Sequence, residues 1–505
     1  MQFVLSAGAI LVVVLWGLWS PASLGAVFDQ ALAAITHNFG WLYLWTVLGL
    51  VVMAIALAVS RYGELKLGGE DDEPEFSVGA WFAMLFAAGM GIGLVFWGVA
   101  EPLSHYGAPP PGVAARTPEA ANAALRYSFF HWGLHPWAVY SVVALAIAFF
   151  QFRRGGSVLV STAVASLPWR GMARLSPLVD ALAVVATAFG VAASLGIGAL
   201  QINSGLHAVF GLPVGTASQV AIIVVTTLLF VGSAVTGVAR GIKWLSSFNL
   251  VVAALLAAAV FLLGPTVTII DTFTNTLGAY LSEFVRMSLR MTPFRDSEWV
   301  GSWTVFYWAW WIAWSPFVGL FIARVSRGRT IREFVAGTMI APALAAFVWF
   351  SVFGGTALQF EIRGVAPVAE AVKADVSTAL FAMFDALPGG TVMAVVATVL
   401  VLVFFVTSGD SATLVLGMMS SGGDPDPKAR VKIVWGVLVS GIAISLLLAG
   451  GVKAVQTATI VFALPFTVVI LLMALALWRA VREDWREQQR RERALRRRMR
   501  EIAGK

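Results

Sequence analysis

The sequence lacks cysteine altogether and contains few histidines. Without cysteine, the chain cannot form a disulfide, a thiol nucleophile or a thiolate metal site. Only His131 and His135 have the i,i+4 spacing with which two imidazoles bind one metal from a helix, and no carboxylate accompanies them in a zinc-type motif. We therefore expect the two histidines to be hydrogen-bonded rather than to hold a metal.

Charge is also scarce. Only 12% of the 505 residues are charged, whereas 59% are hydrophobic. A soluble protein of this length needs far more charge to cover its surface, so the composition indicates a polytopic membrane protein. The formal net charge of +7 does not indicate nucleic-acid binding, because the excess of Lys and Arg lies in loops and in the tail.

Apolar runs long enough to cross a bilayer recur along the whole chain, which predicts an all-α protein. The first run has neither a basic flank nor a clear cleavage site, so we expect a retained span rather than a signal peptide. The basic loops predict that both termini are cytoplasmic. The twelve expected spans are 3–19, 41–59, 78–100, 126–150, 178–207, 218–237, 245–270, 300–323, 334–356, 390–418, 430–449 and 453–480.

Three segments outside these spans have a distinct character. Residues 70–75 form an acidic turn, which we expect to be merely solvated. Residues 271–290 place apolar side chains on one face and predict an amphipathic helix along an interface or a partner. The tail, 482–505, is rich in Arg and Glu, and a solvated helix near anionic lipid headgroups is favoured over a regulatory sensor.

Two aromatic surfaces are the most distinctive feature of the sequence. On an ideal helix, Tyr307, Trp310, Trp311 and Trp314 fall within about a third of the circumference. A second surface, formed by Trp132, Trp137 and Tyr140, precedes it in the fourth span, where Pro136 would bend the helix. Two such surfaces can enclose a cation that has no hydrogen-bond donor, such as a quaternary ammonium. Packing and interfacial anchoring are the competing interpretations.

Glycines and hydroxyl groups interrupt the other apolar spans. The third span contains Gly89, Gly91 and Gly93, a pattern of either an unwound ligand-binding segment or close helix packing, and continues to Glu101. Thr407 and Ser408 in the tenth span offer hard oxygen ligands for a small cation, although hydroxyls in helices more often bond to their own backbone. Asp410, beside them, either has a function or caps and pairs locally.

The glycine run ending at Glu101-Pro102, the run 131–140 and the run 307–319 together resemble the betaine/choline/carnitine transporter family, in the same order and spacing. The resemblance implies two leading helices and then a leucine-transporter-like pair of inverted five-helix repeats. The corresponding segments are 1–76 for the leading helices, 77–270 for the first repeat, 271–299 for an amphipathic connecting helix, 300–481 for the second repeat and 482–505 for the basic cytoplasmic tail.

The resemblance also implies residues for two kinds of site. Trp132, Trp137, Tyr140 and Trp311 would surround a trimethylammonium group, with Trp314 and Met90 as further substrate contacts. One sodium ion would be bound by Ala87, Met90, Phe404, Thr407 and Ser408. A second ion would use Thr187 and Phe317, but Val191 stands where the family has a second threonine, and a valine side chain provides no oxygen.

The function implied by the resemblance is sodium-coupled uptake of a quaternary-ammonium compound, glycine betaine before choline or carnitine, for osmoprotection. No other cofactor and no nucleic acid is expected. A homotrimer in a bacterial inner membrane is implied as well. Val191 keeps proton-coupled or exchange transport open as an alternative. An integral-membrane enzyme is the remote alternative, because it would have to combine His131 and His135 with Glu101 and Asp410, which lie in unrelated motifs.

Overall fold

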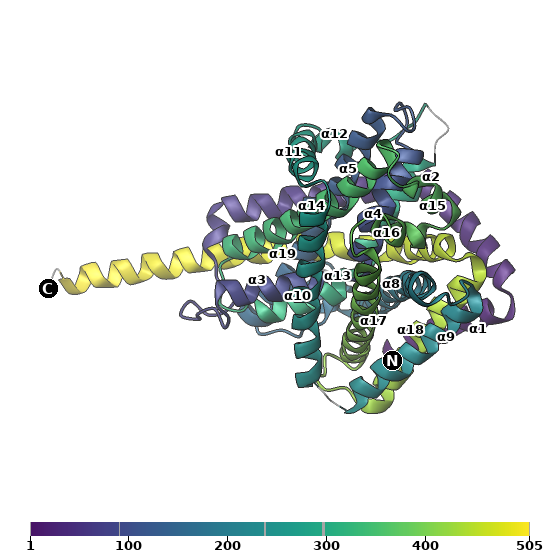
Figure 1. Cartoon of the computed structure of the whole chain (residues 1–505). Coiled ribbons are helices and arrows are strands. Elements are labelled where there is room, and N and C mark those ends of the chain that lie inside the picture. Colours follow the sequence, from purple (N-terminus) through teal and green to yellow (C-terminus); the bar gives the residue numbers. More distant parts are fainter. Residues whose placement is uncertain (1, 90, 237–238, 295–297, 504–505) are drawn as a thin grey trace.

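The structure, a computed structural model, describes residues 2–89, 91–236, 239–294 and 298–503, without the side chains at 86–89, 239–244 and 495. Helices make up nearly all of it, and the described residues contain no β-strand (Figure 1). The longer helices are α1 (Gln2–Trp19), α2 (Pro21–Val59), α3 (Val78–Gly89), α4 (Ile92–Gly107), α5 (Pro118–Trp132), α6 (Leu134–Ala148), α8 (Ser176–Phe210), α9 (Thr216–Thr236), α10 (Ala239–Leu263), α11 (Thr266–Ser282), α13 (Phe306–Val325), α14 (Ile331–Ile362), α17 (Gly390–Ser420), α18 (Ala429–Gly450) and α19 (Val452–Ala503).

Short helices occupy the connections between these elements. They are α7 (Val160–Ala165), α12 (Phe284–Ser288), α15 (Val368–Ala374), α16 (Ala379–Phe384), the 3₁₀ turns η1 (Arg61–Glu64), η3 (Met172–Leu175) and η5 (Val376–Thr378), and the π-helical turns η2 (Phe149–Arg153) and η4 (Gly301–Val305). The class predicted from the sequence, an all-α polytopic membrane protein, is thereby confirmed.

Eleven helical stretches of the described residues are long and apolar enough to cross a membrane. The predicted span that is missing from this set is 78–100, where the helix is interrupted between Gly89 and Ile92. Its two halves, α3 and α4, have 12 and 16 residues, and each is too short to cross a bilayer alone. The count of twelve spans and the inverted repeat stay predictions.

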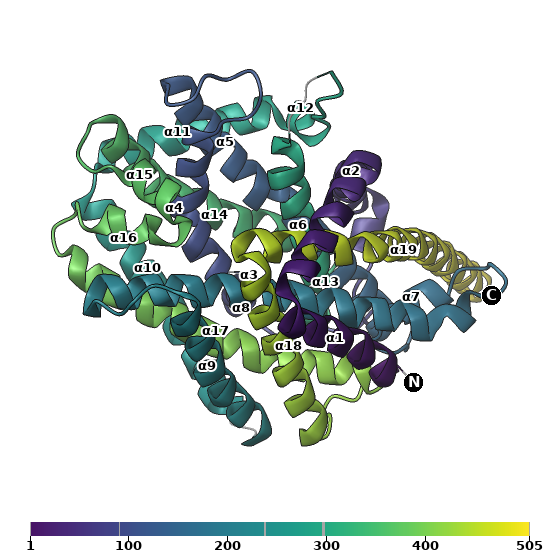
Figure 2. The ribbon, with the colours of Figure 1, turned by 90° about the vertical axis from the view of Figure 1, so that its right-hand side faces the viewer.

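The core lies between α6, α8, α13 and α17. α13 packs on α6 and α8, and α17 packs on α8. Nearly every side chain of α6 and α13 is buried. The outer helices differ, because α9 and α10 expose large apolar side chains such as Leu228 and Leu262. Apolar surface of this kind is stable in contact with lipid, and α9 lies at the periphery beside α18 (Figure 2).

Several helix starts follow directly from the local sequence. Thr330 accepts a hydrogen bond from the backbone of Glu333, whose side chain accepts one from the backbone of Thr330 in return, which is a capping box at the start of α14. Thr117 caps α5 in the same way, with Pro118 as the first helical residue. These caps fix where α5 and α14 enter the membrane region.

Residues 271–290 do not form the single amphipathic helix predicted from the sequence. α11 starts earlier, at Thr266, and the chain breaks at Glu283 before α12. The predicted apolar face is divided, because Tyr280 is buried inside the protein whereas Leu281 and Val285 are exposed. Tyr280 instead stacks its edge on Phe347 of α14. α11, α12 and α5 lie together at one end of the molecule (Figures 1 and 2).

The sequence predicts that the acidic turn 70–75 is merely solvated. In the structure it makes ion pairs with basic residues instead. Asp72 pairs with Arg327 at 3.1 Å and Glu75 with Arg324 at 3.0 Å. The hydrogen bond from Arg327, and a further one from the backbone of Gly69, lower the pKa of Asp72. Glu70 pairs with Arg153. The turn therefore ties the connection after α2 to the basic loop that follows α13.

The tail is a continuation of the last membrane helix. α19 runs without a break for 52 residues and projects beyond the rest of the molecule (Figure 1). Near the point where it leaves the body, Asp484 pairs with Arg153 and, at 3.6 Å, with Arg154. The helical tail that the sequence predicts is therefore present, and ion pairs hold its base to the loop after α6.

Candidate functional site

The break in the third predicted span lies beside the centre of the molecule. Gly91 has an extended backbone (φ −147°, ψ −160°), and α4 starts directly after it. Gly93 has a different role, since a Cβ there would lie 2.6 Å from the ring of Trp310 and 3.2 Å from that of Trp132. The helix is therefore interrupted at Gly91 and closely packed at Gly93, and ligand binding by the interrupted segment stays a prediction. Met90 lies outside the described residues, as does the side chain of Ala87 in α3.

A second break separates α5 from α6 and positions the aromatic surface formed by Trp132, Trp137 and Tyr140. Pro136 cannot donate to the backbone oxygen of Trp132, and its ring would clash with that oxygen. α5 accordingly ends at Trp132, and the chain turns at Gly133, three residues before the bend that the sequence predicts at Pro136. Gly133 is required at the turn, because a Cβ would lie 2.5 Å from the backbone oxygen of Phe129.

The structure brings the four predicted rings into one group, which we call the aromatic cluster. All four are at least 93% buried, and each contact between them is close to perpendicular, as aromatic pairs prefer. The centroid distances and interplanar angles are 5.5 Å and 79° for Trp137–Tyr140, 5.8 Å and 86° for Tyr140–Trp311, and 4.9 Å and 80° for Trp311–Trp132.

Backbone oxygens hold two indoles of the aromatic surface on α13 in place. Trp311 donates its indole N–H to the backbone oxygen of His131 at 2.9 Å. Trp314 donates to the backbone oxygen of Gly190 at 2.8 Å and so connects α13 to α8. Trp308 is fully buried and stacks on His135, and the described residues offer its N–H no acceptor, so it is a packing residue.

Two cavities adjoin the aromatic cluster. The one between the four rings has a volume of only about 10 Å³, too small for a trimethylammonium group, and is also lined by Leu94, Pro342 and Ala346. A much larger cavity of about 790 Å³ starts at Trp132, Tyr140 and Trp311 and reaches the loop before α18 at Asp426. Trp310 and Trp314 line it too, and the rings of Trp310 and Trp311 are stacked, with their centroids 5.3 Å apart.

The predicted oxygen ligands of α17 face this large cavity. Phe404, Thr407, Ser408 and Asp410 all line it. The Thr407 hydroxyl donates to the backbone oxygen of Val403 at 2.9 Å, which leaves its oxygen lone pairs available to a cation. Asp410 is buried, and its Oδ2 has no hydrogen-bond partner within the described part of the chain. The cavity therefore combines aromatic faces with uncommitted oxygens.

The residues predicted for a second ion do not all line the large cavity. Phe317 lines the large cavity and contacts the ring of Trp314 at 5.1 Å. Thr187 and Val191 are fully buried on α8, and neither is among the described residues that line the cavity. The Thr187 hydroxyl has no hydrogen-bond partner in the described structure. Val191, one helical turn away, gives this hydroxyl no polar companion.

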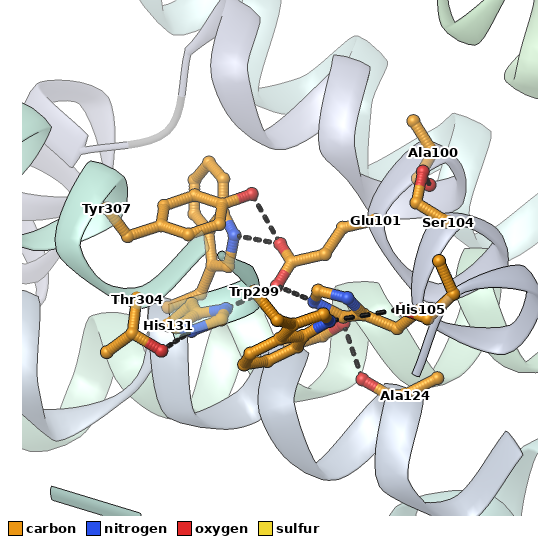
Figure 3. A network of polar contacts seen from close by, with 12 residues as sticks. Ala100, Glu101, Ser104, His105, Ala124, His131, Trp299, Thr304 and Tyr307 are labelled. Carbon is orange, nitrogen blue, oxygen red and sulfur yellow. Dashed lines mark hydrogen bonds and ion pairs between the residues drawn. The ribbon is translucent and has the colours of Figure 1, made fainter. Parts of the chain in front are cut away.

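A fully buried polar network lies directly behind the aromatic cluster (Figure 3). Glu101 Oε1 lies 2.7 Å from His131 Nδ1 and 3.2 Å from His105 Nε2. Its Oε2 accepts from the Trp132 indole at 2.8 Å and from the Tyr307 hydroxyl at 2.5 Å. Sequence reasoning missed this network, although the i,i+4 spacing of Glu101 and His105 within an apolar span was a usable signal.

The same network decides between metal binding and hydrogen bonding. The ligand atoms of Glu101, His105 and His131 lie within 4.8 Å of one another. Two ligands of one tetrahedral Zn²⁺ ion, each about 2.0–2.1 Å from the metal, lie roughly 3.3 Å apart. The 2.7 Å separation of Glu101 Oε1 and His131 Nδ1 is that of a hydrogen bond instead. His135, which bonds to Ser288 at 2.7 Å, is likewise hydrogen-bonded, as the sequence predicts.

The contact of Glu101 with His131 corrects one expectation. The sequence analysis places these residues in unrelated motifs, but α4 and α5 cross so that the two side chains meet. His135 and Asp410 take no part in the network, because His135 bonds to Ser288 and Asp410 lies in the wall of the large cavity. Acid–base groups thus meet, and Glu101, His105 and His131 are all fully buried.

Comparisons with known proteins agree with this arrangement. Residues 1–486 match the model of the betaine/carnitine/choline family of transporters. The chain is 48% identical to the glycine betaine transporter OpuD of Bacillus subtilis, over 94% of this chain and 93% of the relative. It is 47% identical to an ectoine/hydroxyectoine transporter of Virgibacillus pantothenticus, over 93% and 94% of the two chains. A probable glycine betaine transporter of Desulfitobacterium hafniense is 42% identical over 95% of this chain and 97% of its own.

These relatives are named as transporters, and the family they belong to consists of transporters and not of enzymes. The match covers both broken helices, the aromatic cluster and the large cavity. The chain belongs to the betaine/carnitine/choline family of transporters.

Proposed function

We propose that this protein imports a quaternary-ammonium compound, glycine betaine first, by sodium symport. The observation that carries the proposal is the aromatic cluster at the inner end of a cavity of about 790 Å³. A trimethylammonium group offers no hydrogen-bond donor, so ring faces are the groups that can select it. The relatives named as glycine betaine and ectoine/hydroxyectoine transporters support the same class of substrate.

The present conformation fits one stage of alternating access. The space between the four rings is nearly closed, whereas the large cavity extends to Asp426 and Lys432 beside a basic loop. Basic loops face the cytoplasm, so this cavity is the inward-facing route of release. Substrate binding then requires the rings of Trp137, Tyr140 and Trp311 to separate by a few ångströms.

Sodium is proposed to bind where the break between α3 and α4 meets α17. Thr407 and Ser408 supply hydroxyl oxygens, and Phe404, Ala87 and Met90 supply backbone oxygens under this proposal. Unwound segments and hydroxyls at mid-membrane are the usual ligands of coupling ions in such transporters. One ion is proposed rather than two, because Val191 leaves the second set incomplete.

Uptake into proteoliposomes tests the proposal. Vesicles with a defined inward sodium gradient should accumulate radiolabelled glycine betaine, and replacing sodium by potassium should abolish the accumulation. Choline, carnitine and ectoine compete in the same assay and rank the substrates. If no trimethylammonium compound accumulates with sodium, the proposal is wrong.

Proton-coupled or exchange transport is the second candidate. Two observations favour it: Val191 removes a sodium ligand, and Asp410, in the wall of the large cavity, has an oxygen without a partner in the described structure. A carboxylate in this position can carry a proton. Uptake that ignores sodium but responds to an imposed pH gradient identifies this mechanism.

The proposed setting is a homotrimer in a bacterial plasma membrane with both termini in the cytoplasm. Exposed Leu281 and Val285, on α11 and α12, supply apolar surface for contact with a second copy or with lipid. Crosslinking through single cysteines introduced at these positions tests this assembly, since the chain has no cysteine of its own.

A further inference from the structure

The hydrogen bonds around Glu101 indicate that its carboxylate is ionised. Four polar groups surround it, two at each oxygen: ring nitrogens of His131 and His105 lie at Oε1, and Trp132 and Tyr307 donate to Oε2. A carboxylate accepts four such bonds, two for each oxygen, without a proton of its own. The Trp132 indole can only donate, so a proton on Oε2 would compete with it.

The histidine assignment agrees with this picture. His131 Nε2 lies 3.0 Å from the hydroxyl of Thr304, which can donate to it and leave the hydrogen on Nδ1 for Glu101. Within the described residues, no Lys or Arg forms an ion pair with Glu101. The negative charge is therefore stabilised by hydrogen bonds alone, in a fully buried position where an anion is otherwise costly.

This charge is coupled to the aromatic cluster through a single side chain. Trp132 contributes its ring to the cluster, 4.9 Å from the ring of Trp311, and donates its N–H to Glu101 at 2.8 Å. A charge-assisted hydrogen bond to an indole N–H shifts electron density into the ring. The ring face, which attracts a cation through its negative potential, becomes more negative.

We propose that Glu101 is a positioning and specificity-determining residue, whose ionised carboxylate orients Trp132 and strengthens the attraction of that ring for a cation. The inference rests on the proposed function, because it assumes that a quaternary ammonium occupies the aromatic cluster. It assigns Glu101 a role without direct contact with the substrate. The network behind the rings then serves to favour a positive charge over a neutral group of the same shape.

The test compares two carboxylates of the same shape, one with a cationic trimethylammonium group and one with a neutral tert-butyl group in its place. Glycine betaine and 3,3-dimethylbutanoate have the same shape, but a carbon replaces the ammonium nitrogen in the second. Binding of both to the purified full-length protein, in sodium, is measured by calorimetry for wild type and Glu101→Gln. We expect the variant to bind glycine betaine about tenfold more weakly and the isostere within about twofold of wild type. An equal loss for both ligands, or a loss for neither, overturns the inference.

A second variant covers the case in which Glu101→Gln does not fold. Tyr307→Phe removes one donor from Oε2 and leaves the Trp132 indole as the remaining donor to this oxygen. We expect the isostere to bind within about twofold of wild type, and glycine betaine to bind as tightly as to wild type or up to about threefold more tightly. If instead both ligands weaken together, the network only braces the structure and the inference is wrong. A wild-type protein that binds no trimethylammonium compound contradicts the proposed function itself.

Discussion

The indole of Trp311 donates its hydrogen to the backbone oxygen of His131, 2.9 Å away. That oxygen is available because α5 ends at Trp132 and the helix does not continue through Gly133. A ring on α13 is therefore fixed by the break between α5 and α6. The two aromatic surfaces are not merely opposed but joined by a directional bond.

Replacing this ring should abolish recognition without unfolding the protein. Trp311→Leu removes one ring of the aromatic cluster, and we expect glycine betaine affinity to fall about 30-fold or more, since a desolvated cation–π contact contributes about 2 kcal/mol. Quenching of intrinsic tryptophan fluorescence by the ligand measures this affinity. Trp311→Phe keeps a ring face but not the N–H, so its affinity for glycine betaine should lie between those of wild type and Trp311→Leu. Wild-type binding by Trp311→Leu would rule out a role of the cluster in recognition.

Gly93 and Gly91 provide a matched pair of substitutions. A Cβ at Gly93 would collide with Trp310 and crowd Trp132, whereas a Cβ at Gly91 meets nothing within 4 Å. We expect Gly93→Ala to displace the cluster and lower the apparent affinity for substrate about tenfold, as a 1–3 kcal/mol overpacking would. Gly91→Ala should stay within about threefold of wild type. The dependence of uptake on substrate concentration measures the apparent affinity of each variant. Equal losses in Gly93→Ala and Gly91→Ala would contradict the packing role of Gly93.

The hydroxyls of α17 should control the sodium dependence. Thr407→Ala combined with Ser408→Ala removes two oxygens from the wall of the large cavity. We expect half-maximal uptake to need at least tenfold more sodium, while the order of preference among glycine betaine, choline and carnitine is unchanged. Sodium titration of uptake at saturating substrate measures the shift. A changed preference with unchanged sodium dependence would place these residues in substrate recognition instead.

A single oxygen should be enough to alter the coupling ratio. Val191→Thr adds a hydroxyl one helical turn from the unpartnered hydroxyl of Thr187, at nearly constant volume. If the proposal of one ion is right, the sodium Hill coefficient of uptake should rise from about one toward two. Val191→Ala, which changes size but adds no oxygen, serves as the control. An unchanged coefficient in Val191→Thr would mean that Thr187 belongs to no ion site.

The pair Asp72–Arg327 predicts a pH-dependent contribution to stability. The hydrogen bond from Arg327 lowers the pKa of Asp72 in the folded protein. The stabilisation is therefore present above the unfolded pKa of about 3.9 and is lost as the pH falls through the lowered native value. Asp72→Asn should melt slightly below wild type at pH 7, and the difference should vanish once the pH lies below the lowered native pKa of Asp72. Thermal unfolding in detergent measures it, and a difference that persists in acid would contradict the assignment.

Local patterns in the sequence predicted most of the helices and the two aromatic surfaces, and the family resemblance selected the four rings of the aromatic cluster. Helical spacing places Trp311 and Trp314 on one face, and a proline marks the break near Trp132. The network around Glu101 could not be found in this way. Its partners His131 and Tyr307 lie 30 and 206 residues away along the chain, so only the crossing of α4, α5 and α13 brings them together.

The closed state of the rings was equally inaccessible to sequence reasoning. The same residues serve every stage of a transport cycle, and a pattern of residue types does not specify which stage is populated. The position of the turn at Gly133 depended on a contact too, since Phe347 of α14 fills the space that a Cβ would need. Tertiary packing, rather than local preference, decided these features.

The unbroken helix α19 has a mechanical consequence. Its 21 residues after Arg482 extend roughly 30 Å past the membrane helix, at 1.5 Å per residue. A tilt of the last span by about 10° would sweep the tip sideways by roughly 5 Å, because no hinge lies between the two parts. Small rearrangements of the last apolar span are thereby amplified into displacements of the Arg-rich rod that continues it.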